Sequence, residues 1–339
     1  MLTLAESYIH SLDPDAIRIT DSFTIKWYGL SYLAGFLIAW WLIRWLAGSG
    51  RILLSRTDAT DFITYCVGGV LVGGRVGYCV FYDPSLLIDF SSEFPFWGLL
   101  AIHQGGMASH GGMIGVIAAM LLFSRSRHLP FLHLLDVTAF IAPPGLFFGR
   151  LANFINGELW GVALPDSMQA NPPWWSVKYP QEIQAAPIEA IMSLNTTITG
   201  SPAPGSMDPT RTIIQEAYAG NAELISQMAP YLVARWPSQL FQAASDGPAL
   251  LLALALVWLV PRKPGVIAGC FLFFYGVFRI LTEVFREPDE GVALFLSLSR
   301  GQVLSVALVI AGITLTMFAA TRSSDPIGGL KSVASRPTR

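Results

Sequence analysis

The sequence predicts an all-α, polytopic integral membrane protein with about seven transmembrane helices and an external cap segment. Two features of composition support this class: 53% of the 339 residues are hydrophobic and only 13% are charged, whereas soluble domains carry about 25% charged residues. A third feature is the presence of seven separate apolar stretches. The formal net charge of −2 provides no basic surface for nucleic acid, so we expect no nucleic-acid partner.

The apolar stretches are long enough to cross a bilayer, whose core requires about 20 mostly apolar residues per helix. They cover residues 24–46, 61–82, 98–124, 133–158, 247–261, 265–286 and 301–320. The third stretch begins with HQGGMASHGG, which indicates a re-entrant or unwound entry. The predicted organisation is one membrane domain, with helices one to four in 1–158, a periplasmic cap segment in 159–246, helices five to seven in 247–320 and a tail in 321–339.

The distribution of lysine and arginine predicts the orientation. Three basic residues lie in 44–56, two in 125–127, two in 262–263 and four in 322–339, against seven on the opposite side over longer stretches. Because short cytoplasmic segments carry an excess of basic residues, the N-terminus is expected outside and the C-terminus in the cytoplasm. Four tryptophans in the cap segment are candidate membrane-interface anchors: Trp160, Trp174, Trp175 and Trp236.

The second predicted span contains an arginine among glycines, in GGVLVGGRVGY (residues 68–78). Gly69, Gly73 and Gly77 recur every four residues, and the favoured explanation for them is close helix packing. Arg75 is different, because an arginine in mid-span costs about 2.5–3.5 kcal/mol on insertion scales. It therefore requires a partner or an anionic ligand.

The fourth predicted span ends in GRLANFINGELWG, residues 149–161. If the helix continued to the end of this motif, Arg150, Asn153, Gly157 and Gly161 would lie on one face. A guanidinium, an amide and two bare backbone positions suit a phosphate or carboxylate ligand. The alternative is a structural ion pair of Arg150 with Glu158.

Two further groups interrupt the apolar pattern. Arg279, Glu283 and Arg286 share a helix face in FRILTEVFREPDE (residues 278–290), where the arginine-first order is the weaker one for helix stability. A functional charged cluster is favoured over a buried structural pair. His110 lies in GGMASHGGMIG, where glycines on both sides allow a ligand to approach, and we expect a functional role for it.

These motifs together resemble one family. KWYGLSY (26–32), GGRVGY (73–78), HGGMIG (110–115), GRLANFINGELWG and FRILTEVFREPD occur in the same order as in the prolipoprotein diacylglyceryl transferases. The resemblance implies transfer of the sn-1,2-diacylglyceryl group of phosphatidylglycerol to the lipobox cysteine of a prolipoprotein. A thioether would form at the periplasmic face of the bacterial inner membrane, and glycerol 1-phosphate would leave.

The resemblance also implies roles for individual residues. Arg150 matches the family's phospholipid-binding arginine, and three neighbours match the same motif: Asn153, Glu158 and Gly161. Other positions that the family requires match Tyr28, His110, Arg279 and Glu283. The sequence departs from the family at Trp236–Gln242 (WPSQLFQ), where the family has His-Pro-Ser-Gln-Leu-Tyr-Glu, and at Val162, where a basic residue is usual.

A mechanism follows as a hypothesis. His110 would take the proton of the cysteine thiol, whose ordinary pKa is about 8.5. Arg150 and Arg279 would stabilise the growing phosphate charge, with Glu283 orienting Arg279 and with Asn153 or Tyr28 holding the head group. We expect no metal or cofactor, since no ligand cluster is visible. A transporter, with a pathway open to both faces, and a structural assembly protein are the competing classes.

Overall fold

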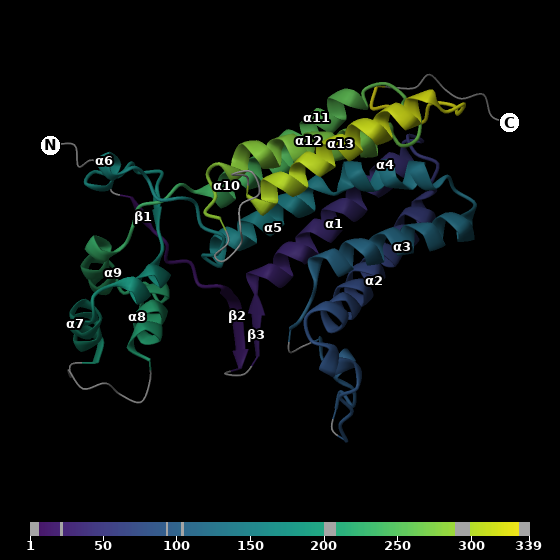
Figure 1. The fold of residues 1–339 in the computed structure, drawn as a ribbon. Helices are drawn as coiled ribbons and strands as arrows, with labels where there is room; N and C mark the ends of the chain where they lie inside the picture. Colours follow the sequence, from purple (N-terminus) through teal and green to yellow (C-terminus); the bar gives the residue numbers. More distant parts are fainter. Residues whose placement is uncertain are drawn as a thin grey trace. The chain divides into compact units, whose positions relative to one another are not determined.

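Helices dominate the computed structural model, which describes residues 7–20, 23–92, 94–102, 105–199, 208–288 and 299–331 (Figure 1). This confirms the predicted all-α membrane class. The few strands are short. β1 (Tyr8–Ile9) pairs in parallel with β4 (Val177–Lys178), and β2 (Asp15–Thr20) forms an antiparallel hairpin with β3 (Phe23–Lys26).

Five helices among the described residues are long and apolar enough to cross a membrane. They are α1 (Trp27–Gly48), α2 (Arg56–Phe81), the run Ser238–Val257, α12 (Val266–Glu283) and α13 (Arg300–Thr321). The run Ser238–Val257 consists of α10 (Ser238–Ala244), a π-helical turn η6 (Ser245–Ala249) and α11 (Leu250–Val257). It begins nine residues before the predicted start of the fifth span at 247.

The predicted span 133–158 is a bent pair of helices, α4 (Phe131–Ile141) and α5 (Pro143–Ile155). The break falls at Pro143, which has no backbone N–H to continue the helix. Counted together, this pair is a sixth candidate span. The predicted span 98–124 contains the helical turn η2 (Gly98–Leu100) and then α3, which begins only at Ser109 and ends at Arg127. Because α3 is not among the candidates in the described residues, the count of seven stays a prediction.

The chain divides into two compact units. The first unit contains residues 1–34, 146–249 and 275–308, and the second contains residues 35–145, 250–274 and 309–339.

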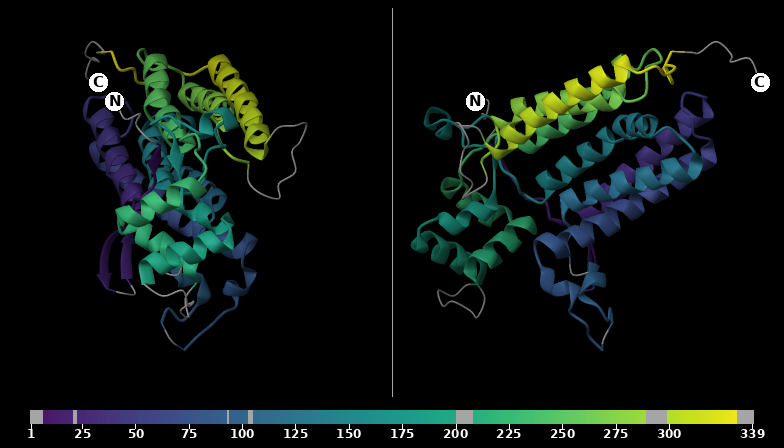
Figure 2. Two further views of the ribbon diagram at one scale, coloured as in Figure 1. Left: turned by 90° about the vertical axis from the view of Figure 1, so that its left-hand side faces the viewer. Right: turned by 45° about the vertical axis from the view of Figure 1, so that its right-hand side comes forward.

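In the second unit, α2 and α3 run side by side (Figures 1 and 2). A Cβ on Gly73 would lie 2.4 Å from the carbonyl oxygen of Gly111, and one on Gly69 would lie 2.5 Å from that of Gly115. The packing role favoured for the glycines of α2 is therefore confirmed. Helix α2 begins with a capping box, in which Ser55 and Asp58 each accept a hydrogen bond from the other's backbone N–H.

In the first unit, the cap segment (residues 159–246) folds into short helices around its own apolar core. Besides α10, its helices among the described residues are α6 (Asp166–Gln169), η4 (Pro180–Ala185), α7 (Ile188–Thr199), α8 (Pro209–Tyr218), α9 (Ala222–Met228) and η5 (Ala229–Tyr231). Ile183, Leu194, Ile213, Leu224 and Met228 are all at most 2% exposed and pack together. The small bundle that they stabilise is visible in Figure 2.

Three of the four candidate interface tryptophans pack against the protein instead of standing free. Trp160 stacks on Tyr179 with 5.3 Å between ring centroids, and Trp175 stacks on Trp236 at 4.8 Å. Each of these three indoles has an aromatic partner within the cap segment, and their role as interface anchors stays a prediction. Trp174 alone among the four is largely exposed, at 69%.

Candidate functional site

Arg150 lies on α5 and forms an ion pair with Asp246, which belongs to the π-helical turn η6. Nε of Arg150 is 3.0 Å from Oδ2 of Asp246. The Asp246 side chain is fully buried and that of Arg150 is 16% exposed. A buried charge without a partner is strongly unfavourable, so each group requires the other. The pair engages Nε, and the guanidinium carries four further N–H donors on its two Nη atoms.

One helical turn further along α5, Asn153 joins a second polar group. Its amide donates to Oε1 of Glu158 at 2.8 Å and also to the hydroxyl of Tyr28. The Tyr28 hydroxyl donates to the same carboxylate oxygen. The structure therefore brings together three residues of the predicted site. Glu158 is bonded to Tyr28 and Asn153, so the alternative of an Arg150–Glu158 ion pair is wrong.

The helix does not extend through the whole 149–161 motif, as the single-face prediction required. It ends at Ile155, and Gly157 has a left-handed backbone conformation with φ of +60°. Only Arg150 and Asn153 share a helix face. Gly161 lies where chain segments approach closely, since a Cβ there would be 2.0 Å from the carbonyl oxygen of Trp236 and 2.9 Å from that of Phe285. Protein backbone thus occupies the side on which a ligand was expected.

The predicted cluster at the end of α12 is present. Nη2 of Arg279 is 2.9 Å from Oε2 of Glu283, and Nη1 of Arg286 is 3.7 Å from Oε1 of Glu283. The hydroxyl of Ser299 donates to Oε1 of Glu283 at 3.2 Å. Arg279 is 9% exposed and Glu283 is 8% exposed. The i,i+4 pair is therefore buried, which explains why it exists despite its unfavourable order for an exposed helix.

Arg279 has an unused donor. Its Nη1 atom is buried and has no hydrogen-bond partner among the described residues. Arg279 also lies within electrostatic range of Arg150 and of Asp246, so the two ion pairs form one cluster. A buried guanidinium nitrogen without an acceptor is costly. An anionic acceptor would satisfy this nitrogen.

The second unit contains the two remaining predicted residues. Arg75 on α2 donates to four backbone carbonyls, those of Gly98 (2.5 Å), Leu99 (2.8 Å), Gly105 (2.7 Å) and Gly106 (3.1 Å). An arginine in mid-span requires hydrogen-bond partners, and these four carbonyls provide them for Arg75 without any ligand.

His110 is exposed in the first turn of α3. Its predicted role as the base stays a prediction.

Asp246 was not among the residues that the sequence predicted for the site. The predicted fifth span began at residue 247 and so left this carboxylate just outside the membrane. The helix that begins at Ser238 includes it. The sequence does contain a feature that could have identified Asp246: it lies at the start of a run of apolar residues, with no lysine or arginine within four positions. Such a residue requires a partner from elsewhere in the chain.

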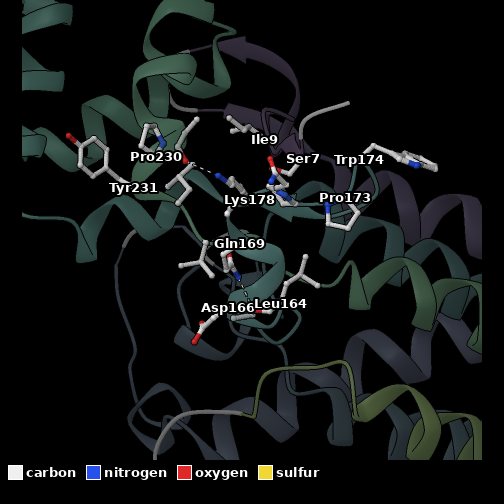
Figure 3. A pocket seen from close by; sticks show the side chains of 17 residues that line it. Ser7, Ile9, Leu164, Asp166, Gln169, Pro173, Trp174, Lys178, Pro230 and Tyr231 are labelled. Atoms are coloured by element: carbon white, nitrogen blue, oxygen red, sulfur yellow. Dashed lines mark hydrogen bonds between the residues drawn. The ribbon is translucent and has the colours of Figure 1, made fainter. Parts of the chain in front are cut away.

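A groove of about 860 Å³ lies between the cap segment and the N-terminal residues Ser7 and Ile9, and none of the arginines discussed above lines it. Figure 3 shows its prolines and aromatic rings, including Pro173, Trp174, Pro230 and Tyr231. Lys178 donates to the carbonyl oxygen of Ala229 at 2.8 Å, one of the dashed contacts in that view. The groove contains none of the predicted site residues.

Helices that can cross a membrane, together with buried arginine–carboxylate pairs, define a polytopic membrane protein with a buried charged cluster. The family model for prolipoprotein diacylglyceryl transferase matches residues 14–318 of the chain. This is most of the chain, which therefore belongs to that family.

Several relatives named phosphatidylglycerol–prolipoprotein diacylglyceryl transferase are similar to this chain over nearly their whole length. The protein of Bdellovibrio bacteriovorus is 41% identical, with 95% of this chain and 96% of the relative covered. That of Rhodospirillum rubrum is 35% identical, with 94% and 95% covered. That of Xylella fastidiosa is 38% identical, with 91% and 93% covered.

Proposed function

We propose that this protein transfers the sn-1,2-diacylglyceryl group of phosphatidylglycerol to the lipobox cysteine of a prolipoprotein. The cysteine sulfur forms a bond to the glycerol carbon, the bond from that carbon to the phosphate oxygen breaks, and glycerol 1-phosphate leaves with the electron pair. Family membership and the names of the relatives support this reaction. The unused Nη1 of Arg279, close to Arg150, is the structural observation that supports it most strongly.

The two arginines bind the phosphate in this proposal. The phosphodiester carries one negative charge, and the leaving monoester approaches two. Cations that hold this growing charge bind the transition state more strongly than the ground state, which accelerates the reaction. Glu283 holds Arg279 through Nη2 and leaves Nη1 for the ligand. Asp246 holds Arg150 through Nε, and the guanidinium charge of Arg150 attracts the same phosphate.

Tyr28, Asn153 and Glu158 form the second part of the proposed site. Their mutual hydrogen bonds leave a carboxylate and a hydroxyl that are suited to the hydroxyl groups of the glycerol head group. His110 accepts the thiol proton as general base, because a thiol with a pKa of about 8.5 is mostly protonated at neutral pH. We assign Arg75 and Gly161 supporting roles, since Arg75 donates to backbone carbonyls and Gly161 lies against the backbone of Trp236 and Phe285.

The proposed location is the bacterial inner membrane, with the N-terminus outside, the C-terminus in the cytoplasm and the active site towards the periplasmic face. The concentration of lysine and arginine in short segments on one side supports this orientation. In such an arrangement phosphatidylglycerol enters from the outer leaflet, and the prolipoprotein presents its signal peptide and lipobox cysteine from the membrane.

The test is a transfer assay with membranes that contain the protein, phosphatidylglycerol and a lipobox peptide, and with the thioether product measured by mass spectrometry. Arg150→Ala is expected to reduce the rate at least about 100-fold, as loss of one charge-stabilising donor does in other enzymes. Arg127→Ala is the matched control, because Arg127 is 45% exposed in a surface ion pair. Near-normal activity of Arg150→Ala would contradict the proposed role.

His110 is tested by its pH profile. His110→Gln should lower the rate most at neutral pH and less at alkaline pH, where the thiol ionises without help. A His110→Gln variant with the wild-type rate across this range would show that His110 is not the base.

A further inference from the structure

The turn that carries Glu158 is held by side chains of the cap segment. Trp160 donates from Nε1 to the carbonyl oxygen of Gly157 at 2.6 Å, and Gln181 donates to the same oxygen at 3.3 Å. Gln239 donates from Nε2 to the carbonyl oxygen of Glu158 at 2.7 Å. Ser238 donates to the next carbonyl, that of Leu159, at 3.3 Å. Three consecutive carbonyls of the turn therefore have a side-chain donor.

The backbone of this turn requires such support. Gly157 has a φ of +60°, and Leu159, which is not a glycine, has a φ of +55°. A left-handed conformation is unfavourable for leucine and persists where the surroundings hold it in place. Glu158 lies between these two residues, so the direction of its side chain depends on the turn being kept.

The side-chain amide of Gln239 is hydrogen-bonded at both its nitrogen and its oxygen. Gln239 is 1% exposed, and its Oε1 accepts a hydrogen bond from the hydroxyl of Tyr179 at 3.1 Å. Tyr179 is fully buried and stacks on Trp160, which itself bonds to the turn. Both ends of the Gln239 amide are thus engaged, which sets the position of its donor relative to Glu158.

We propose that Gln239 is a positioning residue of the transferase, which acts through Glu158 and makes the cap segment part of the active site. Gln239 fixes the carbonyl of Glu158, and the Glu158 side chain then meets Tyr28 and Asn153. This inference rests on the proposed function for its activity test. It assigns a role to the first part of the cap segment and to the start of α10. The proposed reaction alone gives these two segments no role.

The test compares Gln239→Met with Gln169→Met. Methionine has nearly the same volume as glutamine but cannot donate. Gln169 is the control because it also donates to two backbone carbonyls of the cap segment, at 2.9 and 3.0 Å, without contacting the Glu158 turn. Gln239→Met should lower kcat/KM about 10- to 100-fold, the range expected for a small misplacement in an active site. Gln169→Met should stay within about twofold even if its thermal stability falls.

A double-mutant cycle tests whether Gln239 acts through Glu158. The kcat/KM of the double variant Gln239→Met/Glu158→Gln should be within about twofold of Glu158→Gln alone. The proposal would be overturned if the effects of the two substitutions on kcat/KM multiply in the double variant. It would also be overturned if Gln239→Met folds and has the wild-type rate. The cycle is repeated on thermal unfolding, where the Tm shifts of Gln239→Met and Glu158→Gln should be less than additive; additive shifts would also overturn it. No thioether product from the wild-type protein would instead refute the proposed function, and the unfolding cycle would still decide the role of Gln239.

Discussion

The ion pair of Arg150 and Asp246 leads to a prediction about stability that can be tested without an activity assay. Asp246→Ala removes a fully buried carboxylate and leaves Arg150, 16% exposed, without its ion-pair partner. Breaking a buried pair from one side costs about 3–5 kcal/mol. Replacing both partners with apolar groups is often close to neutral. The double variant Arg150→Met/Asp246→Ala should therefore unfold less easily than Asp246→Ala alone.

The assay is the free energy of unfolding of the ligand-free protein in mixed micelles, measured by titration with a denaturing detergent. Asp61→Ala is the control, because Asp61 is 39% exposed and pairs with Arg127 at the surface, where such a pair contributes at most about 1 kcal/mol. The reasoning is refuted if Asp246→Ala lies within about 1 kcal/mol of wild type. It is equally refuted if the double variant loses as much as the two single variants together.

Three more predictions concern glycine packing and pH. Gly73→Ala should separate α2 from α3 and lower the Tm. Gly68→Ala is the control: its added Cβ meets no neighbouring atom within 4 Å, so the free energy of unfolding should change by no more than about 1 kcal/mol. Equal Tm values for the two variants would contradict the close contact of α2 and α3. Gly161→Ala should abolish transfer, because its Cβ would lie 2.0 Å from the carbonyl oxygen of Trp236, and an active variant in the transfer assay would show that this backbone can move. Burial lowers the pKa of His10 in the folded protein, so this side chain binds a proton more readily in the unfolded state. The contribution of neutral His10 to the free energy of unfolding is therefore fully present above about pH 6.5 and is lost as the pH falls. In thermal unfolding at pH 7.5 and 5.5, His10→Phe should reduce this loss, and an unchanged loss would exclude His10 as its source.

The sequence predicted the helices better than it predicted where they begin and end. Apolar runs of about 20 residues located α1, α2, α12 and α13 to within five residues at each end. The boundaries failed where a polar segment continues a helix, as at Ser238, or where a proline divides one, as at Pro143. Hydropathy is a local average, and it does not register a helix that enters the membrane with buried polar side chains.

In the candidate site, the sequence predicted a contact within one helix but not a contact between distant parts of the chain. The i,i+4 relation of Arg279 and Glu283 is a property of any α-helix, so its spacing predicted the contact that the structure contains. The partner of Arg150 was not accessible in this way. Asp246 is 96 residues away in the chain, and the nearer carboxylate, Glu158, is turned towards Tyr28 and Asn153 by the end of α5 at Ile155.

By itself, the sequence determined that the chain is a helical membrane protein and that its intramembrane arginines require partners, because both conclusions follow from the cost of placing charge in an apolar medium. Only the tertiary structure decided which groups satisfy them: carbonyls for Arg75, Asp246 for Arg150 and Glu283 for Arg279. The physical reason is that transfer costs depend on composition along the chain. Pairing over long range depends on how turns and breaks bring distant residues together.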